Sequence, residues 1–116
     1  MTMRVAVLAQ DLIWQERLAR VVEEAGAQPA RAKSDAEFDA ALATAPRAIV
    51  DMTARAYDPV AAIERASAAG TRVIAVGEHD ALEVRKRALG AGAERVYAYR
   101  KLFEDGPATV TRWLAT

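Results

Sequence analysis

Apolar residues occur along the chain in short continuous runs, separated by longer stretches in which apolar and polar residues alternate with a helical period. The runs are rich in β-branched and aromatic residues and are bounded by polar residues or glycine, which favours strands. Their continuous apolarity is typical of a parallel sheet that is covered on both faces. The predicted strands are residues 4–9, 48–50, 72–76 and 95–99, with a weaker one at 28–32. The weaker strand contains Pro29, which favours an edge position.

The longer stretches have recognisable helix ends. Ser34 and Glu37 have the spacing of a capping box. Asp58 followed by Pro59 is a favoured helix start, because the first N–H group of a helix has no partner within it. The fourth helix is expected to end near Gly90. The predicted helices begin, in chain order, at Asp11, Ser34, Asp58, Asp80 and after Pro107.

Five strands that alternate with five helices predict an α/β fold, because each helix that connects two parallel strands must pack back on one face of the sheet. We expect a three-layer, doubly wound, five-stranded parallel sheet. The 116 residues are enough for one domain with its own core, so residues 1–116 are expected to form a single domain. Trp14 and Trp113 fall at helical spacing among other apolar residues, and both are expected to be mainly buried.

The composition removes several classes of function. Sixteen basic and sixteen acidic residues cancel, so the chain has no net charge to attract nucleic acid or an anionic membrane. It has no cysteine, which excludes thiolate chemistry and sulfur-ligated metals. The first residues lack the apolar region of a signal peptide, and no apolar run approaches the roughly 20 residues of a membrane span. We therefore expect a cytoplasmic protein that binds neither nucleic acid nor membranes.

The chemistry of an open parallel sheet lies at the carboxyl ends of its strands. The ionisable donors near those ends are Asp11, Asp51, Glu78 and His79. One interpretation is that they form an oxygen-rich metal site. The other, which we favour, is that Asp11 caps its helix and Glu78 points to solvent. His79 is the only histidine and neither serine lies in a strand-to-helix elbow, so we expect no catalytic triad and no enzyme activity.

Three features in this (βα)5 order resemble the receiver domain of response regulators in two-component signalling, the CheY-like superfamily. They are Asp51 at the end of the third strand, Pro59 shortly after it, and the segment AGAERVYAY at 91–99 that leads into the fifth strand. The resemblance covers nearly the whole chain and implies a flavodoxin-like receiver fold. It also implies that Asp51 matches the aspartate that accepts a phosphoryl group in this family.

Most of the groups that support phosphorylation in the resembled family are missing here. The two acidic residues that hold Mg²⁺ after the first strand correspond to Ala9 and Gln10. The hydroxyl after the fourth strand corresponds to Gly77. The lysine at the end of the fifth strand corresponds to Tyr99, with Lys101 two residues late. Tyr99 can instead close over the vacated pocket, and the predicted degenerate pocket consists of Ala9, Gln10, Asp11, Gly77, Glu78 and Tyr99.

A lone carboxylate holds Mg²⁺ poorly, because the ion requires several oxygen ligands. We therefore interpret the chain as a stand-alone pseudo-receiver that has no cofactor and acts independently of phosphorylation. Two alternatives remain open. In the first, Asp51 is phosphorylated and displaced acidic residues hold Mg²⁺. In the second, the emptied pocket binds a small molecule.

The fourth helix and fifth strand carry a local group of cations in spite of the neutral total charge. If Val84 and Ala88 face the core, Leu82 and Leu89 are partly exposed beside these cations. An apolar centre with a charged rim suits a protein interface, and the resembled family binds partners at this surface. We expect a protein partner or a second copy here, while an ordinary solvated helix remains the alternative. The predicted partner face consists of Leu82, Arg85, Lys86, Leu89, Arg95, Tyr97, Arg100 and Lys101.

Overall fold

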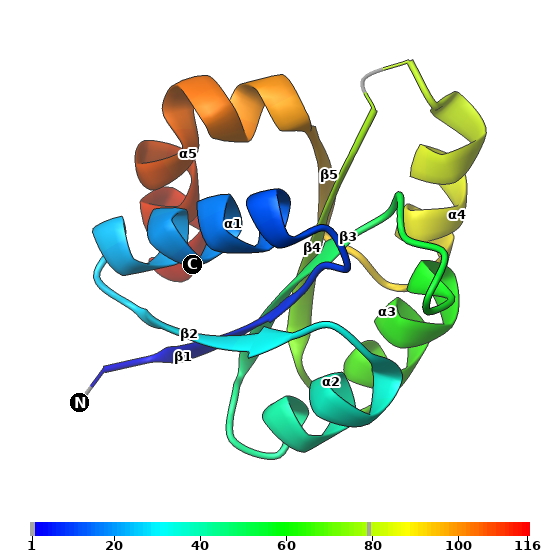
Figure 1. The fold of residues 1–116 in the computed structure, drawn as a ribbon, viewed down its shortest axis with the longest axis horizontal. Coiled ribbons are helices and arrows are strands. Elements are labelled where there is room, and N and C mark those ends of the chain that lie inside the picture. The colour runs from blue at the N-terminus through cyan, green and yellow to red at the C-terminus, as the bar shows by residue number, and fades with distance from the viewer. Residues whose placement is uncertain (1, 79) are drawn as a thin grey trace.

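Five parallel strands form one sheet with helices on both of its faces in the computed structural model, which describes residues 2–78 and 80–116 (Figure 1). The strand order across the sheet is β2-β1-β3-β4-β5. This confirms the expected doubly wound α/β sheet and the edge position of the strand that contains Pro29. The strands are β1 (Arg4–Leu8), β2 (Gln28–Ala32), β3 (Arg47–Asp51), β4 (Arg72–Gly77) and β5 (Arg95–Ala98).

The helices divide into two layers, each with its own apolar core. On one face Leu18 and Trp113 pack on the sheet, and on the other face Phe38 and Ile63 do so. None of the helices in the described residues is long and apolar enough to cross a membrane. One layer holds α1 (Leu12–Glu24) and α5 (Tyr99–Leu114), and the other holds α2 (Asp35–Leu42), α3 (Pro59–Ala68) and α4 (Leu82–Ala91) (Figure 1).

Strand β1 shows why the apolar runs are continuous. Val5 and Val7 point into the α1 and α5 core, whereas Ala6 and Leu8 point into the opposite core, and all four side chains are fully buried. Successive side chains of a strand point to opposite faces, so a strand covered on both sides needs an apolar residue at every position.

Three of the predicted helix starts are confirmed by hydrogen bonds to the capping side chains. The carboxylate of Asp11 accepts from the N–H group of Trp14 at 2.9 Å, and the hydroxyl of Ser34 accepts from the N–H of Glu37 at 3.2 Å. The carboxylate of Asp58 accepts from the N–H of Val60 at 3.0 Å. These bonds satisfy N–H groups that have no partner inside the helix.

The predicted start of the fourth helix is wrong, whereas its predicted end near Gly90 is confirmed. Helix α4 begins at Leu82, with Ala81 as its N-cap and no capping side chain, rather than at Asp80. A turn precedes the helix, in which the N–H of Ala81 donates to the carbonyl of Glu78 at 3.3 Å. The helix continues to Ala91, one residue past Gly90, and Gly92 follows it with φ at 122°. A positive φ is readily adopted only by glycine, so Gly92 ends the helix.

The fifth helix also begins earlier than predicted. It starts at Tyr99, directly after β5, and continues past Pro107 to Leu114. The helical path is interrupted at Asp105, where φ is −140° and ψ is 28°. Pro107 lacks an N–H group and starts a second helical segment after this kink, which is the position that proline tolerates. The proline signal therefore identified a break inside the helix rather than its beginning.

Candidate functional site

Asp51 ends the central strand β3 and is 2% exposed, at the carboxyl edge of the sheet. Its Oδ1 atom accepts hydrogen bonds from the N–H of Thr53 at 3.0 Å and from the hydroxyl of Thr53 at 2.9 Å. The hydroxyl of Tyr99 donates to the same oxygen. Asp51 is therefore bonded by groups of its own chain, and one of them comes from the first turn of α5.

Two phenols bond Asp51, the buried Tyr57 at its carbonyl and the partly buried Tyr99 at its carboxylate. The hydroxyl of Tyr57 lies 2.8 Å from the carbonyl oxygen of Asp51 and 3.2 Å from that of Leu8. Burial, and then the nearby charge of Asp51, raises the pKa of Tyr57 above its usual range. Burial, and then the hydrogen bond with Asp51, raises the pKa of Tyr99 in the same way. Both phenols remain neutral donors at physiological pH, and sequence analysis did not identify Tyr57.

The positions that follow β1 do not direct carboxylates towards Asp51. Ala9 is fully buried and has only a methyl side chain. The side chain of Gln10 turns to the loop after β3, where its Oε1 accepts from the N–H groups of Arg55 at 2.7 Å and Ala56 at 2.9 Å. Asp11 is exposed and caps α1. The side chains of Gln10 and Asp11 are thus bonded to the loop after β3 and to the start of α1.

The residues after β4 contribute little to the pocket. Gly77 is buried, and a Cβ atom added to it would lie 3.5 Å from the Cβ of Met52, which is ordinary van der Waals contact. The backbone at Gly77 therefore leaves room for a Cβ atom. Glu78 is exposed, and His79 lies outside the described residues.

The predicted partner face extends from α4, across the edge strand β5, to the first turn of α5. Leu82 is 65% exposed and Leu89 is 45% exposed, whereas Ala88 is buried, as expected. Several cations of this face form ion pairs within their own helices, which reduces its positive charge. The pairs are Lys86 with Glu83 at 3.8 Å, Arg100 with Glu104 at 2.9 Å and Lys101 with Asp105 at 3.1 Å. Its role as a binding surface stays a prediction.

The structure also has an exposed apolar surface that sequence analysis missed. Leu12, Ile13 and Phe103 on α1 and α5 are each more than 60% exposed. Phe103 was not predicted to be helical, because the fifth helix was expected to start after Pro107. Trp14 is partly buried against the core beside this surface and Trp113 is 6% exposed, so both are mainly buried, as expected. The ring of Trp14 packs on that of Tyr99, with their centroids 4.2 Å apart.

No family model and no curated protein matches the chain. Solved structures match over its whole length. The fold is that of a response-regulator receiver domain. The BeF3-activated receiver domain of DrrB has a TM-score of 0.86 at 16% identity, covering 100% of both chains. A response regulator from Thermotoga maritima has a TM-score of 0.84 at 17% identity, also over 100% of both chains. A CheY-like receiver domain protein from Methanospirillum hungatei JF-1 has a TM-score of 0.77 at 19% identity, covering 99% of this chain and 98% of its own.

The receiver fold implies a Mg²⁺ ion beside Asp51, and the residues present do not fit one. Mg²⁺ requires a nearly octahedral shell of oxygen ligands, several of them from carboxylates or water. Here Ala9 offers no oxygen, and the side-chain oxygen of Gln10 is bonded to the loop after β3. Within residues 2–78 and 80–116, no group of three or more acidic, histidine or cysteine residues is placed to hold a metal ion.

Proposed function

We propose that this chain is a pseudo-receiver, a non-enzymatic signalling module that uses no cofactor, works without phosphorylation and binds a protein through the α4 and β5 edge. The observation that supports this most directly is the state of Asp51. Its Oδ1 atom accepts hydrogen bonds from Thr53 and Tyr99, and the two positions directly after β1, Ala9 and Gln10, carry no carboxylate for Mg²⁺.

Phosphorylation of Asp51 would replace the single negative charge of its carboxylate with about two negative charges on the phosphoryl group, at a buried position. At the position of the family's lysine the chain has the phenol of Tyr99, which bonds Asp51. At the positions of the family's two carboxylates it has the methyl group of Ala9 and the amide of Gln10, which is bonded to the loop after β3. Charge that is not neutralised in a poorly solvated site is strongly unfavourable. A phosphoryl group on Asp51 could act as a signal only by stabilising a second conformation of the chain. The hydroxyl that would bind the phosphoryl group in that conformation is absent, because its position is occupied by Gly77.

Intact-protein mass spectrometry after incubation with acetyl phosphate and Mg²⁺ tests the first half of this proposal. We expect no phosphoryl adduct on the wild-type chain. The positive control is the variant with Ala9→Asp, Gln10→Asp, Gly77→Thr and Tyr99→Lys, which restores the missing groups. An adduct on the wild type that Asp51→Asn abolishes would establish the alternative, in which Asp51 is phosphorylated.

Charge reversal tests the second half. Arg85→Glu combined with Arg100→Glu is expected to weaken binding of a partner or a second copy by about tenfold or more, because rim charges set the complementarity of an interface. Sedimentation velocity measures self-association, and retention of proteins from the source organism on the immobilised chain measures partner binding. Lys33→Glu, at an exposed position outside the predicted face, is the matched control. Equal association of the double variant and the wild type would show that this face is not used.

A further inference from the structure

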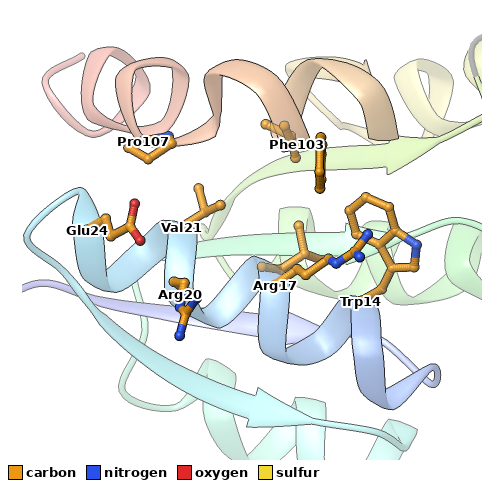
Figure 2. Close-up of a pocket in the computed structure, with 9 residues that line it drawn as sticks. Trp14, Arg17, Arg20, Val21, Glu24, Phe103 and Pro107 are labelled. Atoms are coloured by element: carbon orange, nitrogen blue, oxygen red, sulfur yellow. The ribbon is translucent and has the colours of Figure 1, made fainter.

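A groove lies between α1 and α5, on the side of the sheet away from α4 (Figure 2). Its volume is about 290 Å³. Trp14, Leu18 and Val21 of α1 form one wall, and Leu102, Phe103 and Pro107 of α5 form the other. A groove near 300 Å³ with mainly apolar walls is at the lower end of the size range of small-molecule sites.

The kink in α5 forms this groove. After the interruption at Asp105, Gly106 approaches α1 so closely that a Cβ atom on it would lie 2.8 Å from a methyl carbon of Val21. The helices therefore touch at Gly106, while the segment before the kink carries Phe103 above Arg17 and Trp14 (Figure 2). The phenyl ring of Phe103 is 67% exposed, so one wall of the groove is an aromatic face open to solvent.

Arg17 is the polar group at the aromatic end of the groove. Its guanidinium carbon lies 5.3 Å from the centroid of the Trp14 ring and 5.2 Å from that of Phe103. These contacts restrict the position of the guanidinium through cation–π attraction. Among the described residues, Arg17 forms no ion pair with a carboxylate. Its N–H groups are therefore available to an anion, and a planar guanidinium binds a carboxylate through two parallel hydrogen bonds.

The carboxylate of the groove lies away from Arg17. Glu24 is at the opposite end, near Pro107, and Arg20 lies between Glu24 and Arg17 along α1 (Figure 2). A ligand with an apolar body and one negative charge would thus be oriented, with its charge towards Arg17 and away from Glu24.

We infer that the groove between α1 and α5 binds a small aromatic carboxylate, with its ring against Trp14 and Phe103 and its carboxylate paired with Arg17. This site is separate from Asp51 and from the predicted partner face, so it goes beyond the proposed function and does not depend on it. Trp14 lines the groove and packs on Tyr99, and the hydroxyl of Tyr99 bonds Asp51. The rings of Trp14 and Tyr99 therefore connect the groove to Asp51.

Titration of the ¹⁵N-labelled chain with phenylacetate, followed by NMR, tests the inference. The chain has two tryptophans, and their indole N–H signals report separately on Trp14 in the groove and Trp113 outside it. We expect saturable shifts of the Trp14 indole and of backbone amides along the facing sides of α1 and α5. Phenylacetamide has the same shape without the charge, and we expect it to bind at least fivefold more weakly.

Two variants assign the roles of the groove residues. Arg17→Met keeps an apolar stem and removes the guanidinium, so it should abolish the preference for phenylacetate over phenylacetamide. Phe103→Ala removes an exposed ring that the fold does not require, and it should weaken binding of both compounds. Arg87→Met, at an exposed position on α4, is the control and should bind like the wild type.

Three outcomes would overturn the inference. The first is the absence of saturable shifts at Trp14 with phenylacetate up to about 10 mM, which exceeds the dissociation constant of even a weak specific ligand. The second is an unchanged preference for the carboxylate in Arg17→Met. The third is a set of shifts centred on Asp51 and Gly77, which would place the ligand in the emptied receiver pocket.

Discussion

Tyr99 places a neutral phenol beside Asp51, at the position where the resembled family has a lysine. A lysine at this position would bring a positive charge, whereas the phenol brings a neutral donor and a ring. The hydroxyl of Tyr99 bonds Asp51, and its ring packs on Trp14. One side chain therefore closes the pocket and joins it to α1. Hydrogen bonds within the chain, from Thr53 and Tyr99, thus hold the carboxylate of Asp51 in place.

Removal of the Tyr99 hydroxyl should destabilise the protein. In Tyr99→Phe, Asp51 loses one of its donors while the apolar ring remains, so we expect the free energy of unfolding to fall by about 1.5 kcal/mol. Urea unfolding followed by circular dichroism measures the change. Tyr97→Phe is the matched control, because Tyr97 lies two residues earlier, in β5, and is partly buried like Tyr99 without bonding Asp51. Equal stability of Tyr99→Phe and the wild type would contradict the role given to this bond.

At the scale of elements, the contact between α1 and α5 depends on a glycine. The kink at Asp105 turns α5 so that Gly106 packs on Val21, and Gly106 is buried. The segment after the kink then places Val110 and Trp113 in the core, while the segment before it holds Tyr99 at Asp51. A straight helix beginning after Pro107 would leave Tyr99 and Phe103 without a fixed position.

Two glycine-to-alanine substitutions should have opposite effects. Gly106→Ala brings a methyl group to 2.8 Å from Val21 and should destabilise the protein by about 1–3 kcal/mol through overpacking. Gly90→Ala lies in α4 with no atom within 4 Å of the added methyl group, and it should stabilise by about 0.5–1 kcal/mol through helix propensity. Thermal unfolding of both variants measures the difference. A neutral or stabilising Gly106→Ala would show that the two helices can separate there without loss.

At the scale of the whole molecule, the buried Tyr57 and the partly buried Tyr99 make the stability of the fold depend on pH. Tyr57, just before α3, forms hydrogen bonds with the ends of β1 and β3, and Tyr99, at the start of α5, forms one with the end of β3. Their pKa values are raised in the folded protein, mainly by burial. The folded state therefore retains two protons that the unfolded chain releases near pH 10.

Alkaline pH should consequently weaken the fold. The stabilisation from Tyr57 and Tyr99 is fully present below about pH 10, the pKa of an exposed tyrosine, and is lost as the pH rises above it. We expect the free energy of unfolding to decline above this pH, with tyrosinate absorbance increasing together with unfolding. Urea titrations at several pH values measure the slope. The double variant Tyr57→Phe with Tyr99→Phe should show a clearly smaller slope, and an identical slope would contradict the assignment.

The sequence by itself determined the fold class, the strand positions to within two residues and three of the helix caps. These features depend on local chemistry: Asp11, Ser34 and Asp58 bond N–H groups two or three residues ahead, and buried strands need apolar side chains on both faces. The absence of acidic residues at positions 9 and 10 could likewise be read directly from the sequence.

Only the tertiary structure decided what replaces the missing chemistry. The bond from Tyr99 to Asp51 spans 48 positions, and those from Gln10 to Arg55 and Ala56 span 45 and 46. The groove between α1 and α5 depends on a kink that the sequence pattern placed at a helix start. Such contacts depend on how elements far apart in the chain pack on one sheet. The local periodicity of apolar residues predicts each element but not which side chains of distant elements meet.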